Sequence, residues 1–115
     1  TMKNGFDKKA LEQIWGSSPV CVHTSKNSNS EPVDFHHILG RGGSKGYPSF
    51  FSSVLNSVPL GRSIHNGPLR DSPDQAKVYL RLAAEQTMNA VGQGNYLLTN
   101  KDEAFIEYCE SHEAL

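Results

Sequence analysis

The sequence predicts a small α+β protein with one domain. The chain has 115 residues, which is enough for one modest hydrophobic core. Apolar residues recur with helical spacing near both ends of the chain, while short extended runs and a Gly/Ser-rich stretch occupy its middle. We therefore expect a single domain over residues 1–115, in which flanking helices pack against a central region that holds the extended runs.

The longest predicted helix covers residues 73–91. Ser72 has the side chain of an N-cap, Pro73 suits the first turn, and Asp74 favours the positive end of the helix dipole. The helix is expected to stop at the glycines that follow it. Its apolar residues predict one buried face, composed of Ala76, Tyr79, Leu80, Ala83 and Thr87, with Leu82, Met88 and Val91 nearby.

Two shorter helices are predicted near the ends of the chain. The first covers residues 7–15 and ends at Gly16. The last covers residues 101–112 and starts near Asn100, because Asn100 and Glu103 have the spacing of a capping box.

Three extended runs lie between these helices. The runs at 20–23 and 33–38 are predicted to form a hairpin with a long polar connection. Residues 54–60 are apolar, but Pro59 restricts them to an edge strand or an irregular extended piece. A brief helix over 61–66 follows, closed by glycine and proline.

Charge is unevenly distributed along a chain that is almost neutral overall. Residues 35–70 hold four Lys or Arg and no acid, whereas residues 101–115 hold five acids and one lysine. Residues 40–53 contain four glycines and four serines, which predicts a surface loop, with the apolar piece 48–51 pinning it to the core. The positive segment fits a phosphate-binding patch, and a solvated face is the alternative.

Other features narrow the class of protein. No run approaches the roughly 20 apolar residues of a membrane span, and the N-terminal residues carry charges where a secretory signal would be apolar. We therefore expect a cytoplasmic protein with no membrane partner. Cys21 and Cys109 are far apart and form no CxxC pair, so free thiols are predicted, with Cys109 on a buried helix face.

The histidines of the positive segment carry its chemistry. Neutral imidazole is the commonest side-chain ligand of transition metals. His36 and His37 are adjacent in an extended run and so point to opposite faces, which favours different tasks for the two. His65, on the brief helix, could close a metal site with His36. With only these two protein ligands, other coordination positions on the metal would be open to water and phosphate oxygens, as catalysis needs.

These residues resemble the signature of the HNH nucleases, also called His-Me finger or ββα-metal nucleases. In that family a strand with His-His or Asp-His is followed by a loop, an Asn, a second strand and a last His or Asn on a helix. Here HHILGRGG, starting at His36, looks like the first half in many bacterial and phage members, and the spacing from Asn56 to His65 is similar to that of the second half. The match covers about 35 residues and includes Leu60.

The resemblance implies a small ββα-metal core over about 20–70, flanked by the helices at 7–15, 73–91 and 101–112. It implies metal-dependent hydrolysis of DNA phosphodiester bonds, with double-stranded DNA as the main substrate. It also implies one divalent metal ion, with Mg²⁺ as the first choice and Mn²⁺, Ni²⁺ or Zn²⁺ as alternatives. A homodimer or a larger nuclease assembly is compatible with it.

The same resemblance implies a role for each matching residue. His36 and His65 would be metal ligands, His37 the general base that deprotonates water, and Asn56 the residue that orients His37 through loop hydrogen bonds. Asp34 lies two residues before His36, on the same strand face, and is a candidate second-layer partner or third ligand. The cations expected to contact phosphates are Arg41, Arg62, Lys45 and Arg70.

The chain also departs from the family pattern. Gly61 and Ile64 stand where many members have a pair of zinc-knuckle cysteines, and Leu69 replaces a further histidine of some members. A scaffold without zinc is therefore expected. Two alternatives remain open: a non-catalytic zinc-binding module using Cys21, His23, His36 and His65, and a degenerate nuclease fold that only binds DNA or a protein.

Overall fold

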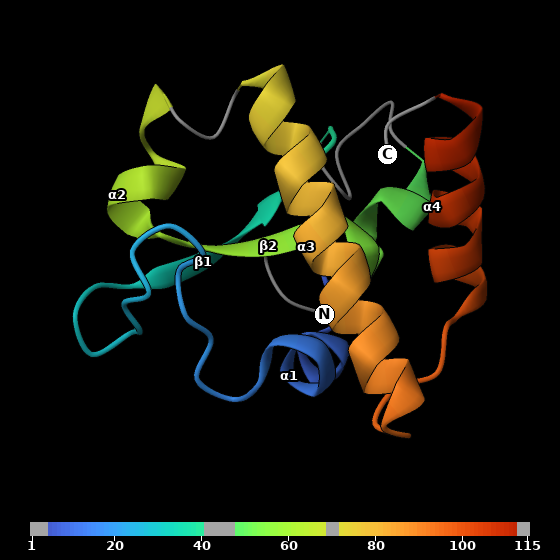
Figure 1. Ribbon diagram of the computed structural model, residues 1–115, viewed down its shortest axis with the longest axis horizontal. Coiled ribbons are helices and arrows are strands. Elements are labelled where there is room, and N and C mark those ends of the chain that lie inside the picture. Colours follow the sequence, from blue (N-terminus) through green and yellow to red (C-terminus); the bar gives the residue numbers. More distant parts are fainter. Residues whose placement is uncertain (1–4, 41–47, 69–71, 113–115) are drawn as a thin grey trace.

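The computed structural model describes residues 5–40, 48–68 and 72–112. Its two strands form an antiparallel sheet that packs against helices (Figure 1), so the predicted α+β class is confirmed. In chain order the elements are α1 (Lys8–Trp15), β1 (Val33–His37), η1 (Ser49–Ser52), η2 (Val54–Asn56), β2 (Ser57–Gly61), α2 (Arg62–His65), α3 (Pro73–Gly92) and α4 (Asn100–Ser111), where η denotes a 3₁₀ helix.

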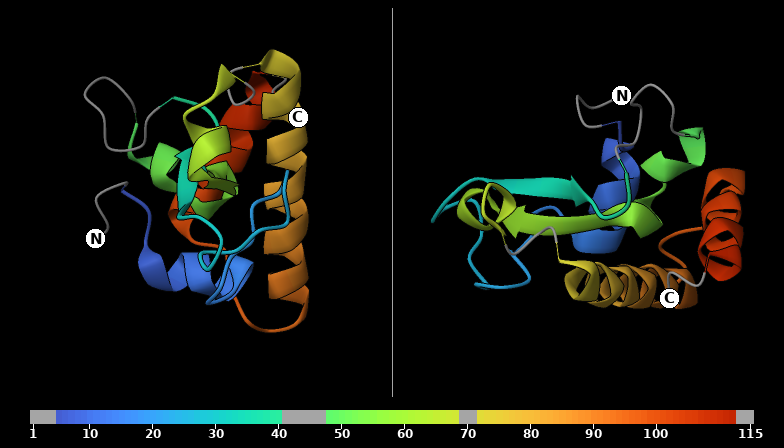
Figure 2. Two further views of the ribbon diagram at one scale, coloured as in Figure 1. Left: turned by 90° about the vertical axis from the view of Figure 1, so that its left-hand side faces the viewer. Right: turned by 90° about the horizontal axis from the view of Figure 1, so that it is seen from above.

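The helices surround the sheet on several sides. Helix α3 crosses in front of the strands in Figure 1, α4 stands beside α3, α1 lies below, and α2 follows directly from the end of β2. Seen from above in the right-hand view of Figure 2, α3 lies along one face of the strands and α4 stands beyond one end of them. The end of α1 is tied to the start of β2, because the indole Nε1 of Trp15 donates to the Ser57 hydroxyl over 3.0 Å.

The register of the sheet sends alternate residues to two different clusters. His36 pairs with Val58 and His37 with Ser57. Val58 and Leu60 are fully buried in a core cluster that includes Tyr79, Leu80 and Phe105 of the two long helices. Phe35 instead packs against a second cluster, made by Phe6, Leu11, Ile14, Val54, Ala90 and Tyr96. Since side chains alternate along a strand, His36 and His37 face different sides, as predicted.

The predicted strand at 20–23 is wrong, and so is its hairpin with 33–38. The chain makes a turn there, in which Cys21 N donates to Lys26 O and Ser25 N donates to Cys21 O, both over 2.9 Å. Ser25 has a φ of 59°, the left-handed conformation typical of a turn. These bonds use backbone groups that a strand would need. The partner of β1 is β2, which lies about twenty residues further along the chain.

The segment before β2 also differs in part from the prediction. Residues 54–56 are the helical turn η2 rather than extended chain, because the Ser53 hydroxyl accepts from Leu55 N over 3.1 Å and closes the turn. Strand β2 therefore starts at Ser57. Phe51 is buried in the core, as expected for the apolar piece 48–51, whereas residues 41–47 of the predicted loop lie outside the described residues.

The predicted helices at 7–15, 73–91 and 101–112 are present, and the brief helix predicted over 61–66 is α2. Asp7 caps α1 by accepting from Lys9 N and Ala10 N. Ser72 is the N-cap of α3, although its side chain makes no capping bond. The capping box of α4 lies one residue earlier than predicted, at Thr99 and Asp102. This pair has the same spacing as Asn100 and Glu103. The structure uses it because Asp102, unlike Glu103, is buried.

Both cysteines are buried free thiols. Burial raises the pKa of Cys109, in the core beside Phe105, to about 11. Among the described residues, no helix combines the length and apolar character needed to cross a bilayer.

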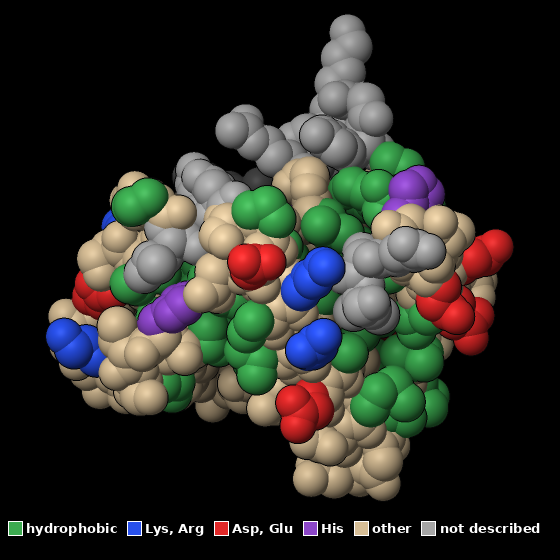
Figure 3. All heavy atoms as spheres, turned by 45° about the horizontal axis from the view of Figure 1, so that its top comes forward, with side chains coloured by type: hydrophobic (Ala, Val, Ile, Leu, Met, Phe, Trp, Pro, Cys, Tyr) green, Lys and Arg blue, Asp and Glu red, His purple; other side chains and the backbone are tan. Residues whose placement is uncertain are grey.

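Charged side chains border the surface between α3 and α4. Figure 3 shows Lys and Arg side chains near the middle of this face with acidic side chains beside them, and a larger acidic group further to the right. Helix α3 carries two exposed acids, Asp74 and Glu85. The exposed cations of α3 include Lys77 and Arg81.

Candidate metal centre

The structure brings His36 and His65 together. His36 lies on β1 and His65 ends α2, the short helix that follows directly from β2. Their ring centroids are 5.4 Å apart and the ring planes meet at 63°. The two residues are 29 positions apart in the sequence, so this proximity depends on the pairing of β1 with β2.

The separation of the two rings fits a shared metal ion. An imidazole nitrogen binds such an ion at about 2.1 Å, and the ring centroid lies about 1.2 Å behind that nitrogen. Two rings 5.4 Å apart are therefore close enough for one ion to lie between them. Imidazole ligands suit Ni²⁺ and Zn²⁺, whereas Mg²⁺ and Mn²⁺ prefer oxygen ligands.

Asp34 supports His65 from the side. Its Oδ2 lies 3.3 Å from Nδ1 of His65, which leaves Nε2 of His65 for a metal, the usual arrangement of a metal-binding histidine and its carboxylate partner. Arg62 donates to the same carboxylate through Nε and Nη2, at 3.3 and 3.0 Å. The hydrogen bond from Arg62 is the main reason that the pKa of Asp34 is lowered, and His65 contributes further.

The three side chains Asp34, His36 and His65 are not placed as a three-ligand site. Among the described residues, no group of three or more His, Cys, Asp or Glu side chains could hold one ion. The same finding means that Cys21, His23, His36 and His65 do not assemble into a zinc tetrahedron. The third-ligand role considered for Asp34 is therefore not supported, whereas its contact with His65 fits the second-layer role.

Tyr79 lies beside His36 and also contacts His23, a packing that the sequence did not indicate. Tyr79 of α3 is 1% exposed, and its ring centroid is 6.2 Å from that of His36. Its hydroxyl lies 2.6 Å from Nε2 of His23. The helical pattern showed only that Tyr79 is a core residue, and a local pattern cannot show that a turn around residue 23 meets its hydroxyl.

His37 lies on the other face of β1. Its ring stacks on Phe6, with centroids 4.1 Å apart and planes within 16°. Nε2 of His37 is buried and has no hydrogen-bond partner among the described residues. Burial lowers the pKa of His37, and the nearby His65 lowers it further, so the neutral, basic form is favoured.

Asn56 ties the start of the loop after β1 to the segment before β2. Its side chain is fully buried. Oδ1 accepts from Leu39 N over 2.8 Å, and Nδ2 donates to Leu39 O and Phe51 O over 2.9 and 2.8 Å. The backbone oxygen of Asn56 also accepts from Ile38 N over 3.0 Å. These bonds fix the chain directly after His37, as the role predicted for Asn56 requires.

Replacing Asn56 by alanine should lower the free energy of unfolding by about 3 kcal/mol. The change removes three side-chain hydrogen bonds and leaves buried backbone groups of Leu39 and Phe51 unpaired, each at a cost of about 1–3 kcal/mol. Urea denaturation of Asn56→Ala measures the effect. Asn89→Ala, at an exposed position of α3, is the matched control and should stay within about 0.5 kcal/mol of wild type. Equal stability of both variants would contradict the role of the Asn56 network.

The predicted phosphate contacts are described in part. Arg62 is 56% exposed and its side chain is bound to Asp34, but a guanidinium has five N–H donors, so its outer Nη1 group remains available. Arg41, Lys45 and Arg70 lie outside the described residues. Only Arg62 of the four predicted cations can therefore be placed near the histidines.

Comparison with known proteins adds no assignment. No protein-family model, no curated protein and no solved structure matches the chain. The site has to be interpreted from its own geometry.

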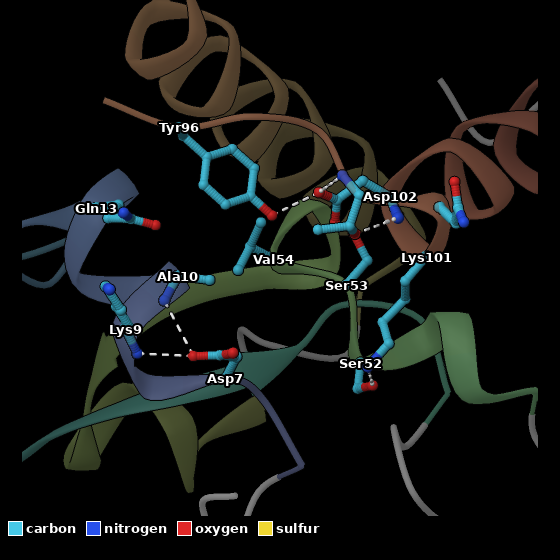
Figure 4. Close-up of a pocket in the computed structure, with 12 residues that line it drawn as sticks. Asp7, Lys9, Ala10, Gln13, Ser52, Ser53, Val54, Tyr96, Lys101 and Asp102 are labelled. Atoms are coloured by element: carbon cyan, nitrogen blue, oxygen red, sulfur yellow. Dashed lines mark hydrogen bonds between the residues drawn. The ribbon is translucent and has the colours of Figure 1, made fainter. Parts of the chain in front are cut away.

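A cavity of about 510 Å³, most of whose lining residues are polar, lies between the first turns of α1 and α4. Figure 4 shows Tyr96 and Ser53 pointing at Asp102, whose carboxylate accepts from both hydroxyls, at 2.5 and 2.6 Å, and from Thr99 N. Lys101 at its edge donates to the Ser52 hydroxyl over 3.1 Å. Both helix ends are capped by the chain's own side chains, so this cluster is accounted for as a structural support.

Proposed function

We propose that the chain is a metal-dependent endonuclease of the HNH type that hydrolyses DNA phosphodiester bonds. In this proposal β1, β2 and α2 form a ββα-metal core, and α1, α3 and α4 support it. The observation that carries the proposal is the meeting of His36 and His65 at 5.4 Å, with Asp34 against Nδ1 of His65. The Asn56 network next to His37 supports it independently.

His36 and His65 would hold the divalent ion. When bound, the ion would offset the negative charge that develops on the phosphate and on the departing oxygen. The available donors of Arg62 would contact a neighbouring phosphate oxygen while its other donors keep Asp34 in place. Asp34 would thereby hold His65 in one ring orientation and one tautomer.

His37 would act as the general base. Its ring lies on the opposite face of β1 from the two proposed metal ligands, so this role requires the phosphate to reach past the strand to His37. The lowered pKa of His37 favours the neutral imidazole. The proton of the attacking water would pass to this imidazole. Such base catalysis contributes about 10²–10⁴-fold to a rate.

A plasmid assay tests the proposal. Supercoiled DNA incubated with the protein should be nicked or linearised in the presence of Mg²⁺, Mn²⁺, Ni²⁺ or Zn²⁺, and EDTA should abolish cleavage. His65→Ala should lose cleavage and metal binding by calorimetry, whereas His112→Ala, at an exposed position, should retain both. Cleavage that persists in EDTA, or in His65→Ala, would overturn the metal role.

A second candidate function is DNA binding without cleavage. The stacking of His37 on Phe6 and the burial of its Nε2 favour this alternative, because they restrict the approach of water to the ring. Retarded migration of a duplex oligonucleotide, with metal binding but no cleavage under any of the four ions, would support it over the nuclease.

A further inference from the structure

The turn between α1 and β1 carries a third histidine on the side of the sheet where α3 packs. Val22 N donates to Pro59 O over 3.2 Å, which places this turn along the edge of β2 that does not pair with β1. The right-hand view of Figure 2 shows this part of the chain and α3 on the same face of the strands. His23 of the turn and His36 of β1 therefore flank β2 from its two sides.

Tyr79 of α3 contacts both of these histidines. Its ring centroid is 5.6 Å from that of His23 and 6.2 Å from that of His36, and both contacts are edge to face. Tyr79 is buried, and its hydroxyl lies 2.6 Å from Nε2 of His23. A buried hydroxyl is costly without a hydrogen-bond partner, so this bond ties the orientation of His23 to the position of α3.

The direction of this hydrogen bond decides which nitrogen of His23 is left for a ligand. Burial raises the pKa of Tyr79, so its hydroxyl keeps the proton and donates to Nε2. A neutral imidazole that accepts at Nε2 carries its hydrogen on Nδ1. His23 is exposed, and its Nδ1 has no hydrogen-bond partner in the described part of the chain. The donor that His23 offers to a ligand is therefore Nδ1–H.

We propose that Nδ1–H of His23 binds a backbone phosphate of DNA and that Tyr79 is the residue that positions it. The inference rests on the proposed function in so far as the ligand is DNA. A strand whose reacting phosphate lies on the metal of His36 and His65 would extend along the same face of the sheet. A flanking phosphate would then meet an N–H donor of fixed direction, the kind of contact that sets the register of a protein on nucleic acid.

The charges around the turn are compatible with a bound anion. Lys26 is the only Lys, Arg, Asp or Glu in residues 20–30. Glu31 and Asp34 follow, but each accepts a hydrogen bond from a side chain of α2. Asp74, in the first turn of α3, lies about 140° around that helix from the tyrosine. The turn itself therefore contributes one cation and no acid.

Binding of a labelled duplex oligonucleotide, measured by fluorescence anisotropy in EDTA, tests the role of His23. EDTA stops the proposed cleavage, so the assay reports affinity alone. His23→Ala should weaken binding about tenfold, the effect of one hydrogen bond to a charged group. His23→Gln keeps an N–H donor and should recover part of the affinity. His112→Ala, at another exposed histidine, should bind as wild type.

Tyr79→Phe tests the positioning role, because it removes the hydroxyl and keeps the ring beside His36. It should weaken DNA binding less than His23→Ala does, about threefold, since the imidazole remains but is free to rotate. The double variant should bind no more weakly than His23→Ala alone, because the hydroxyl acts through His23. Additive losses would instead indicate a separate structural effect. Urea denaturation checks that each variant is folded.

Metal affinity separates this inference from the role of the metal ligands. Calorimetry with Ni²⁺ should show a change of less than about threefold in His23→Ala and Tyr79→Phe, since His36 and His65 are untouched. Wild-type DNA affinity in His23→Ala would overturn the inference, as would additive losses in the double variant or a wild-type chain that binds no duplex. A chain that binds the duplex through His23 but never cuts it would contradict the nuclease and support this inference.

Discussion

Replacing His37 by alanine is expected to lower the rate of DNA cleavage by about 10²–10⁴-fold, the usual contribution of a general base. The affinities for metal and for DNA should change less than about threefold, because the proposed ligands His36 and His65 and the guanidinium of Arg62 are untouched. Single-turnover cleavage of a labelled duplex measures the rate, and calorimetry with Mn²⁺ measures the metal affinity.

His36→Ala provides the contrast for this prediction. It should lose both cleavage and metal binding, whereas His37→Ala should lose cleavage alone. His112→Ala, at an exposed position of the last helix turn, should behave as wild type. Full activity in His37→Ala would show that another group accepts the proton, and loss of metal binding in that variant would show that the two adjacent histidines do not have separate tasks.

Replacing Asp102 by alanine should lower the free energy of unfolding by about 4 kcal/mol. Asp102 is 1% exposed and accepts hydrogen bonds from Ser53, Tyr96 and Thr99 N. Hydrogen bonds to a charged group contribute about 1.5–3 kcal/mol each, although removal of a buried carboxylate also relieves part of its desolvation cost. The bond from Thr99 N, which is the Asp102 half of the capping box of α4, is one of these three bonds. Urea denaturation followed by circular dichroism measures the change.

The neighbouring Glu103 supplies the matched control. Glu103→Ala removes an exposed carboxylate from the same helical turn and should change the stability by no more than about 0.5 kcal/mol. If Asp102→Ala were as stable as Glu103→Ala, the polar cluster in Figure 4 would not be a structural support and its cavity would have to be reconsidered as a binding site.

The helices could be predicted because their signals are local. Asp7 and Gly16 bound α1, and Ser72 and Pro73 mark the start of α3. The capping box of α4 was placed one residue too late because two overlapping pairs have equal spacing, and only burial distinguishes Asp102 from Glu103. The pairing of β1 with β2 is a non-local contact, so the nearer apolar run at 20–23 was assigned as the partner strand in error.

The sequence motif predicts which residues form the candidate site, but not their contacts with residues outside the motif. The motif placed His36, His65 and Asn56 in one region, and the structure brings the two histidines together. The contacts of Tyr79 with His23 and His36 depend on how α3 packs against the sheet, and no spacing rule contains that information. The stacking of Phe6 on His37 likewise comes from the chain before α1, outside the motif.

Pro59 has a consequence for how copies of this protein can meet. Arg62 N donates to Pro32 O, and Ile38 N donates to Asn56 O. Hydrogen-bonded and non-hydrogen-bonded residue pairs alternate along an antiparallel ladder. The pair of Pro59 with Phe35 is therefore a non-hydrogen-bonded one, and the backbone of Pro59 faces outward. A proline has no N–H to offer there, and its carbonyl already accepts from Val22 N. The outer edge of β2 is thereby blocked against the addition of a foreign strand, which protects a sheet of only two strands from growing into fibrils.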